Sequence, residues 1–331
     1  MVEVVVTGAS GHIGYVLVKR LLESKQYAVK AFVLKGENVE HLEQLGVPIV
    51  YGDVRDKESL KKAFIGADIV FHLAGMIEIG NGNKKKMEEV NLQGTKNVLE
   101  VCIQTKVKRL VYTSSVHAIP EKPKGQVMTE TKTFSPDWVK GSYAKTKAAA
   151  TKYLLENYQG KIELVIVHPS GVIGPYEYIP SNLGQLVMDC ANKKIGAYLE
   201  GGYNFVDVRD VAQGIMLAAQ RGESGECYIL AGHQVSVRNL MKMIEEITKV
   251  PAPKFKIARW FAYITGILSE WYSKIRKEKP LFTSYAVYTL GTNSNFSNDK
   301  AIKELGYQVR PMEETLKDTI TWLKENNKIN I

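Results

Sequence analysis

The sequence predicts an α/β fold in which a parallel β-sheet is covered by helices on both faces. In the first half of the chain, short runs of β-branched and apolar residues alternate with longer segments of helical periodicity. Several of the short runs, such as EVVVTG and DIVFHLAG, are apolar almost throughout. Strands of this kind are buried on both sides, which is typical of parallel sheets because their crossover helices lie on both faces.

The expected strands and helices alternate as far as residue 175. We expect strands in EVVVTG, AVKAFVL, PIVYGD, DIVFHLAG, RLVYTSS and ELVIVHPSGVIG, the last ending in a turn rich in Pro and Gly. We expect helices up to Ser24, over KESLKKAFIG, through VNLQGTKNVLEVCIQT, and from GSYAKTK into the alanines that follow. The later run ECYILAG is expected to form a further strand of the same sheet.

A more mixed pattern then predicts a smaller, mostly helical second part. We expect a helix near residues 183–192, a short strand in AYLEGG, the segment NFVDVRDVAQGIMLAAQ and a helix at 237–248. Pro251 and Pro253 break the chain before an aromatic-rich helical segment. Two capped helices are expected at the end, one starting at Asn298 or Asp299 and one within residues 312–314.

The composition is that of an ordinary globular protein, with 331 residues, 45% of them hydrophobic and 24% charged. The chain opens on an expected strand without a basic-then-apolar leader, and its apolar runs fall short of the ~18 residues that a membrane span needs. We therefore expect a soluble, cytoplasmic protein. Cys102, Cys190 and Cys227 lie far apart without a C-x-x-C motif, which predicts reduced thiols and no metal site.

The formal charge of +9 is concentrated in one short stretch. Between Lys249 and Lys279 there are eight Lys or Arg residues against Glu270 and Glu278. Because no nucleic-acid-binding motif accompanies these charges in the sequence, we expect no nucleic-acid partner. Residues 255–279 interleave six aromatic residues with the basic ones. A helix of this kind can lie on an anionic membrane surface, or it can cover an apolar pocket.

A glycine-rich loop, GASGHIG, directly follows the first expected strand and opens the next helix. Gly8, Gly11 and Gly14 permit a tight turn, close packing of helix on strand, and close approach of a pyrophosphate to the backbone N–H groups of a helix N-terminus. The spacing is G-x-x-G-x-x-G. Its position between strand and helix predicts dinucleotide binding.

Tyr143 and Lys147 are four residues apart in a segment of strong helix formers, so they share one helix face. A phenol titrates near ~10, and an adjacent ammonium favours its anion, so the two side chains can work as one acid/base unit. Taken alone, the pair also fits the solvated face of a Lys-rich helix. Together with the glycine loop, it indicates a catalytic site.

Five motifs, TGASGHIG, DVRD, HLAG, YTSS and YAKTK, follow one another at separations typical of one superfamily. In them the chain resembles the extended short-chain dehydrogenases/reductases, above all the branch of dihydroflavonol reductases, 3β-hydroxysteroid dehydrogenases and NAD-dependent epimerase/dehydratase-like proteins. The resemblance implies a Rossmann-type doubly wound sheet. It implies a dinucleotide-binding domain at 1–175 and a mainly substrate-binding part at 176–331, which returns elements from about 203–232 to the sheet.

The resemblance also implies roles for single residues. Tyr143 resembles the general acid/base, Lys147 would lower its pKa and bind the nicotinamide ribose, and Ser115 would hold the substrate oxygen. If the YTSS motif aligns with the family one residue earlier, Ser114 takes the role of Ser115. Asn91 resembles an asparagine that braces the active-site helix. The implied cofactor contacts, besides Tyr143 and Lys147, are Gly8, Ser10, Gly11, His12, Ile13, Lys35, Asp53, Val54, Leu73, Ala74, Gly75, Asn91, His168, Pro169, Ser170 and Val172.

Other interpretations stay open for several residues. Asp53 could cap the helix that begins at Lys57, and His72 and His168, at the ends of apolar strands, fit structural histidines. The three lysines at 84–86 fit a solvated loop or helix face. A salt-bridge cluster or a substrate contact would equally explain Asp207, Arg209 and Asp210.

The end of the second strand indicates which cofactor is preferred. An acidic residue there would bind the ribose 2′-OH and repel a 2′-phosphate. The strand ends Val33-Leu34-Lys35 instead, and the nearest acid, Glu37, lies beyond a glycine. We therefore expect NADP(H) to be preferred, with Lys35, or in second place His12, facing the phosphate. Leu34 stands where the family usually has Arg, which leaves NAD(H) open.

Two departures from related enzymes bear on the substrate. Nucleotide-sugar epimerases carry an Arg and an Asn where this chain has Asn204 and Ser170, and the dehydratases carry Thr-Asp-Glu where it has Ser115, Val116 and His117. The predicted function is therefore hydride transfer between NADP(H) and a ketone or secondary alcohol of an apolar or aromatic substrate. The alternatives are a nucleotide-sugar epimerase or dehydratase, and a non-catalytic dinucleotide-binding sensor or scaffold. The residues expected to line an apolar pocket are Met76, Ile77, Ile79, Tyr176, Tyr178 and Ile179.

The expected partner is a small-molecule substrate, and the resemblance leaves a homodimer open. It also bears on residues 255–279, because members of the family place a helical substrate-binding element in this region. We therefore favour the pocket cover over the membrane surface for this segment.

Overall fold

The computed structural model describes residues 1–77, 83–276 and 284–331. The predicted pocket residue Ile79 and residues 277–279 of the aromatic-rich segment lie outside the described residues.

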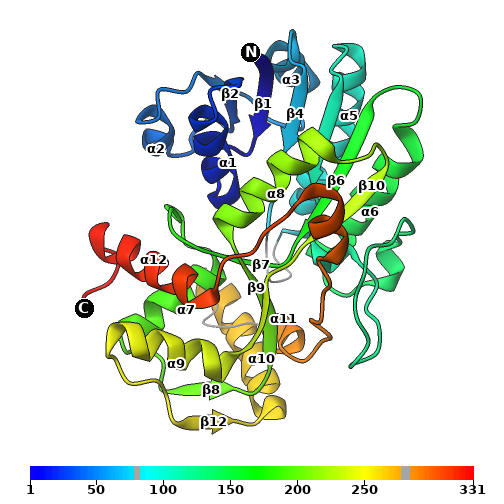
Figure 1. The fold of residues 1–331 in the computed structure, drawn as a ribbon. Helices are drawn as coiled ribbons and strands as arrows, with labels where there is room; N and C mark the ends of the chain where they lie inside the picture. Colours follow the sequence, from blue (N-terminus) through cyan, green and yellow to red (C-terminus); the bar gives the residue numbers. More distant parts are fainter. Residues whose placement is uncertain (78–82, 277–283) are drawn as a thin grey trace.

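A seven-stranded parallel sheet forms the centre of the molecule (Figure 1). Its strand order is β10-β6-β5-β4-β1-β2-β3, and every pair of neighbours is parallel. The α/β, doubly wound fold class is therefore confirmed. The strands are β1 (Val2–Thr7), β2 (Tyr27–Val33), β3 (Ile49–Tyr51), β4 (Ile69–His72), β5 (Arg109–Thr113), β6 (Glu163–Pro169) and β10 (Glu226–Leu230).

Helices cover both faces of this sheet, as the apolar strands require. Val4 and Val6 of β1 belong to one buried cluster, with side chains of α1 and α8. Val5, between them, belongs to a second cluster, with side chains of α3, α5 and α6. Successive side chains of a strand point to opposite faces, so both faces need apolar residues. The helices are α1 (His12–Glu23), α2 (Glu40–Glu43), α3 (Lys57–Phe64), α4 (Lys84–Glu88), α5 (Gly94–Gln104), α6 (Ser142–Asn157) and α8 (Val208–Arg221).

The second part of the chain builds two small sheets and several helices. The strand β9 (Gly202–Asp207) lies between β7 (Gly171–Ile173) and β11 (His233–Ser236), and β8 (Ala197–Leu199) pairs with β12 (Phe255–Ile257). A third buried cluster joins the sheet of β7, β9 and β11 to three helices. The helices of this part are α7 (Asn182–Ala191), α9 (Val237–Thr248), α10 (Arg259–Arg276), α11 (Ser284–Thr289) and α12 (Met312–Glu325).

Within residues 203–232, only β10 extends the central sheet. It pairs with β6, which confirms the strand expected in ECYILAG, whereas β9 belongs to the small sheet with β7 and β11. Two expected helices contain a wider π-helical turn. The helix expected at 90–105 starts with the π-helix η1 (Glu89–Gln93), and the helix expected from Asn298 or Asp299 continues into the π-helix η4 (Ala301–Leu305). No described helix is long and apolar enough to cross a bilayer.

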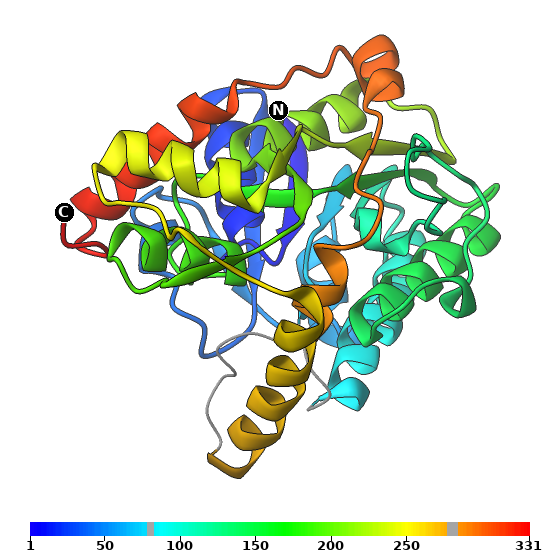
Figure 2. The ribbon, with the colours of Figure 1, turned by 90° about the horizontal axis from the view of Figure 1, so that it is seen from below.

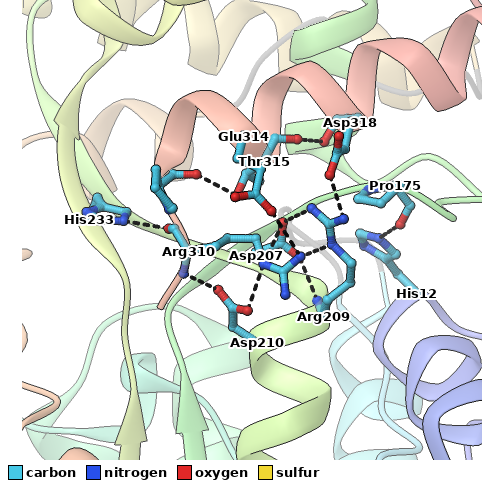
Figure 3. A network of polar contacts seen from close by, with 12 residues as sticks. His12, Pro175, Asp207, Arg209, Asp210, His233, Arg310, Glu314, Thr315 and Asp318 are labelled. Atoms are coloured by element: carbon cyan, nitrogen blue, oxygen red, sulfur yellow. Dashed lines mark hydrogen bonds and ion pairs between the residues drawn. The ribbon is translucent and has the colours of Figure 1, made fainter. Parts of the chain in front are cut away.

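A network of ion pairs joins α8 to the C-terminal helix (Figure 3). The Asp207 carboxylate is buried, caps α8 and accepts from the Arg209 backbone N–H at 2.7 Å. Arg209 pairs with Asp207 at 2.8 Å and with Asp318 of α12 at 2.6 Å. Arg310 pairs with Asp210 at 2.8 Å. Between a salt-bridge cluster and a substrate contact, the structure supports the cluster, because these charges are paired with one another.

Candidate functional site

The glycine loop lies at the point where the order of the strands reverses. The chain builds outward from β1 to β2 and β3, and then returns to β4 on the other side of β1. The helices that follow β1 and β4 therefore lie on opposite faces of the sheet. The carboxyl ends of the strands at such a point are where open α/β sheets bind ligands.

The contact between these two loops explains the glycines. Gly8 has a φ of +69°, and a Cβ atom there would lie 2.7 Å from the backbone N of Ala74. A Cβ atom on Gly14 would lie 2.1 Å from the Gly8 carbonyl oxygen. The Ala74 N–H also donates to Thr7 Oγ1 at 3.2 Å. The loop after β1 thus bends tightly at the start of α1, against the residues after β4, and forms the cradle that a pyrophosphate needs.

Lys147 is buried at the junction of β5, the β4 loop and α6, with 4% of its surface exposed. Its Nζ donates to the Thr113 carbonyl at 2.8 Å and lies 4.9 Å from the centre of the Tyr112 ring. A Cβ atom on Gly75 would lie 3.4 Å from this Nζ, so the β4 loop approaches the amine closely. The alternative of a solvated helix face is therefore wrong for Lys147.

The two neighbouring serines are in clearly different environments. Ser114 is buried and shares a hydrogen bond of 2.7 Å with Thr151 of α6. Ser115 hydrogen-bonds the Tyr143 phenol, and this bond acts to lower the pKa of the phenol. The Ser115 hydroxyl also accepts from the His117 backbone N–H at 3.2 Å. Ser115, rather than Ser114, is therefore the serine beside Tyr143.

The electrostatics of the pair differ from the expectation. Burial raises the pKa of Tyr143 to about 12, and the opposing effect of the Ser115 hydrogen bond is smaller. Burial also lowers the pKa of Lys147 to about 7. The expectation that Lys147 lowers the pKa of Tyr143 is therefore wrong for this structure, because desolvation dominates both groups. At neutral pH Tyr143 is protonated and can act as a proton donor.

Asn91 connects the β4 loop to the helix of Tyr143 and Lys147. Its Oδ1 accepts from the Met76 N–H at 2.7 Å, and its Nδ2 donates to the Met76 carbonyl at 2.9 Å and to Thr146 Oγ1 at 3.1 Å. Asn91 belongs to the π-helix η1, a geometry that is frequent at functional sites. The predicted bracing contact to the active-site helix is thus present.

Four buried polar atoms near the ends of β5 and β6 have no hydrogen-bond partner among the described residues. They are Tyr112 Oη, Thr113 Oγ1, His168 Nε2 and Ser170 Oγ. His168 is fixed by a 3.0 Å bond from Nδ1 to the Ser115 carbonyl and stacks on Phe134, and burial lowers its pKa to about 4. Buried polar groups are rarely left unpaired. With the glycine cradle, these atoms fit the polar groups of a dinucleotide, although His168 also has the structural contacts of the alternative interpretation.

Around the glycine loop, two of the predicted cofactor residues contact other parts of the protein. His12 Nε2 lies 2.9 Å from the Pro175 carbonyl (Figure 3). His12 Nδ1 lies 3.9 Å from the Glu177 carboxylate. Burial lowers the pKa of His12, and its imidazole holds the loop after β7. Ser10 Oγ donates to the Glu37 carboxylate at 2.5 Å. Lys35 is exposed.

The remaining predicted positions are structurally accounted for. Asp53 binds Arg55 at 2.6 Å, which lowers the pKa of the Asp53 carboxyl, and Asp56 is the residue that caps α3. His72 lies between Thr7 and Thr95 as a structural histidine, and burial lowers its pKa to about 3. The predicted residues that lie in or against the buried clusters of the sheet are Ile13, Val54, Leu73, Ala74 and Val172.

A cavity of about 250 Å³ is lined by His117, whose ring neighbours that of Tyr143, and mainly by residues that the sequence did not single out. The His117 ring lies 6.2 Å from the rings of Tyr143 and Tyr285, and His117 Nε2 shares a 3.0 Å hydrogen bond with the Tyr203 phenol. Burial lowers the pKa of His117 to about 4. The aromatic residues of the lining are His117, Trp138, Tyr203, Tyr285, Tyr288 and Phe296.

The expected pocket residues are mostly elsewhere. Tyr176 and Tyr178 pack against Tyr15 and Trp322 in the buried clusters. Ile77 and Ile179 are 67% and 60% exposed. The lining instead comes from segments far apart in the chain. Among its aromatic residues, only His117 lies within two residues of a predicted catalytic residue, Ser115, and could have been proposed from the sequence.

The chain is similar to known proteins in family, sequence and fold. The family model described as the 3-beta hydroxysteroid dehydrogenase/isomerase family matches residues 5–230. Sterol demethylase protein B of Methylococcus capsulatus is 29% identical, over 98% of this chain and 99% of the relative. A putative dihydroflavonol 4-reductase of Synechocystis sp. is 30% identical, over 98% and 95%. The crystal structure of gox2253 is 31% identical with a TM-score of 0.86, over 99% of both chains.

The burial of Lys147 predicts a specific dependence of stability on pH. The folded protein releases the Lys147 proton at about pH 7, whereas an unperturbed lysine keeps it to 10.5. Between these values the unfolded chain binds more protons, so this residue makes the free energy of unfolding rise with pH, by up to about 1.4 kcal/mol per pH unit. Lys147→Met should remove this contribution in urea titrations at several pH values.

Lys145→Met is the matched control, because Lys145 is an exposed lysine of the same helix. It should keep the wild-type slope. A Lys147→Met protein whose stability rises with pH as steeply as that of the wild type would contradict the account.

Proposed function

Because the chain belongs to the 3-beta hydroxysteroid dehydrogenase/isomerase family of the extended short-chain dehydrogenases/reductases and is an NAD(P)-dependent oxidoreductase, we propose that it interconverts a ketone and a secondary alcohol of an apolar or aromatic substrate. The observation that carries the proposal is the placement of the Tyr143 phenol, beside Ser115 and with its ring 6.2 Å from the His117 ring of an aromatic-lined cavity.

Tyr143 and Ser115 would act on the substrate oxygen. The bound nicotinamide supplies the hydride in reduction and accepts it in oxidation. Negative charge develops on the substrate oxygen as a carbonyl is reduced, so donors fixed at that oxygen stabilise the transition state more than the ground state. The Tyr143 phenol would transfer its proton to this oxygen, and the Ser115 hydroxyl would hydrogen-bond it. The high pKa of the phenol supports the donor role.

Lys147 and the loops around it would bind the cofactor. The Lys147 amine already donates to the Thr113 carbonyl, which fixes its position and leaves its other N–H groups for the nicotinamide ribose. We assign the pyrophosphate to the loop of Gly8, Ser10 and Gly11. The contacts near the nicotinamide are assigned to Gly75, His168, Pro169 and Ser170, and residues 1–175 are proposed as the dinucleotide-binding domain.

Residues 176–331 would provide most of the substrate contacts. Tyr203, Tyr285, Tyr288 and Phe296 supply flat apolar surface to the cavity, which favours an aromatic or alicyclic ring. Two relatives support the same substrate class, since one is a sterol demethylase protein and the other a putative dihydroflavonol 4-reductase. Asn204, where the epimerases carry an Arg, is buried and binds the Gly232 backbone at 2.8 Å, which weighs against a sugar nucleotide.

The first test is a spectrophotometric assay with a panel of aromatic and alicyclic ketones. Tyr143→Phe should lower turnover by about 10²–10⁴, because it removes the proton donor, while cofactor affinity is retained. Lys147→Met should weaken both cofactor binding and turnover.

Ser115→Ala and Ser114→Ala form a matched pair of variants. The first should lower turnover, and the second, which removes only the buried contact to Thr151, should leave turnover close to that of the wild type. Wild-type turnover by Tyr143→Phe would overturn the mechanism. Conversion of a sugar nucleotide without net use of cofactor would favour an epimerase instead.

NADP(H) is the preferred cofactor in this proposal. Support comes from β2, which ends without an acidic residue, and from the exposed Lys35 that follows it. The Glu37 carboxylate, held by Ser10, opposes the preference because it would repel a 2′-phosphate.

Lys35→Ala should therefore lower the ratio of kcat/KM for NADP(H) to that for NAD(H), and Glu37→Gln should raise it. Steady-state kinetics with both cofactors measure the ratio. Lys62→Ala, at an exposed lysine of α3, serves as the control. An unchanged ratio in Lys35→Ala would remove this assignment.

A further inference from the structure

Large apolar side chains form an outward stripe along α10. Trp260, Tyr263, Ile264 and Ile267 are 69%, 47%, 49% and 46% exposed. Their spacing of three and four residues places them on one face of the helix. Ala262 and Gly266, on the opposite face, are buried. Monomeric proteins rarely expose contiguous apolar surface of this kind unless it binds something.

The surroundings extend this stripe, which we call the α10 stripe. Phe261 is 48% exposed beside it, and Phe255 of β12 is 78% exposed between the exposed lysines Lys254 and Lys256. Figure 2 shows α10, in gold, projecting from the body of the molecule.

The stripe does not take the role of pocket cover that the sequence favours. The cavity beside Tyr143 is covered by Tyr285 and Tyr288 of α11, which packs against α10. Among the described residues, none of those lining the cavity belongs to α10. A Cβ atom on Gly141 would lie 2.4 Å from the Tyr285 ring, so the cover is α11, seated on the start of the catalytic helix.

The basic charge near the α10 stripe indicates which partner the stripe binds. The sequence between Lys249 and Lys279 carries eight basic residues against two acidic ones. Lys254 and Lys256 are the described members nearest the stripe, and Lys256 also pairs with Glu200 at 2.5 Å. A second copy of this chain would bring two basic segments together and would be repelled. An anionic lipid surface would attract them, and its interface favours Trp and Tyr.

We propose that the α10 stripe, with Phe255, Lys254 and Lys256, binds the surface of an anionic phospholipid bilayer. The helix lies in the plane of the interface, with its apolar side chains among the acyl chains and the lysines at the phosphates. Because α11 packs on α10 and lines the cavity, the proposal places the substrate cavity beside the membrane. It holds whether or not the proposed reaction is correct.

Co-sedimentation with vesicles tests the proposal on the full chain. The vesicles contain phosphatidylcholine alone or phosphatidylcholine with phosphatidylglycerol, each at low and moderate salt. We expect binding to the phosphatidylglycerol vesicles, weaker at moderate salt because screening reduces the attraction, and little binding to phosphatidylcholine alone. No binding to phosphatidylglycerol vesicles at low salt would overturn the proposal.

Two isoleucines provide a matched pair of variants. Ile264 in the stripe and Ile302 of η4 are 49% and 48% exposed, and both are changed to Glu. Ile264→Glu should reduce vesicle affinity by more than about tenfold, because the apolar contact is lost, and Ile302→Glu should not. Lys254→Gln should reduce it about fivefold. Equal affinities of the two Glu variants would overturn the proposal.

Unfolding temperatures and sedimentation velocity complete the test. Both Glu variants should unfold at the wild-type temperature, since both positions are exposed, so that a loss of binding is not a loss of folding. A wild-type dimer that Ile264→Glu dissociates, without vesicle binding, would assign the stripe to self-association and contradict the proposal.

Discussion

The burial of one amine organises the site. Lys147 lies away from water among the Thr113 carbonyl, the Tyr112 ring and the β4 loop at Gly75. A buried lysine opposes folding because its charged form is desolvated. The contacts around Lys147 must therefore offset the cost of burying its amine. These contacts come from α6, β5 and the loop after β4. This requirement aligns the helix of Tyr143 with the crevice where the strand order reverses.

Other contacts support the same alignment. Asn91 binds the backbone of the β4 loop and the side chain of Thr146, one residue before Lys147. The Thr7 hydroxyl accepts from Ala74 in that loop and shares a hydrogen bond with His72 at the end of β4. The glycine cradle and the pair of Tyr143 and Lys147 are thereby joined through one short loop. On the other side of the pair, α11 lies against Gly141.

Features that depend on neighbouring residues could be predicted from the sequence. The strands, the glycine loop and the shared face of Tyr143 and Lys147 follow from local periodicity and spacing. The pKa values could not be predicted, because the effect of burial on Tyr143 and Lys147 depends on the whole fold. The cavity was missed because Tyr203, Tyr285 and Phe296 meet only in three dimensions. Tyr176 and Tyr178 were assigned to it because aromatic residues in a loop suit a pocket and a buried stack equally well.

The central claim is that hydride passes between the nicotinamide and a carbonyl carbon beside Tyr143. The most direct measurement uses NADPH deuterated at the transferred C4 position, an aromatic or alicyclic ketone, and mass spectrometry of the product. The account predicts an alcohol with deuterium on its carbinol carbon, in amounts equal to the cofactor oxidised. Cofactor oxidation with an unlabelled product, or conversion of substrate with no cofactor oxidised, would contradict it.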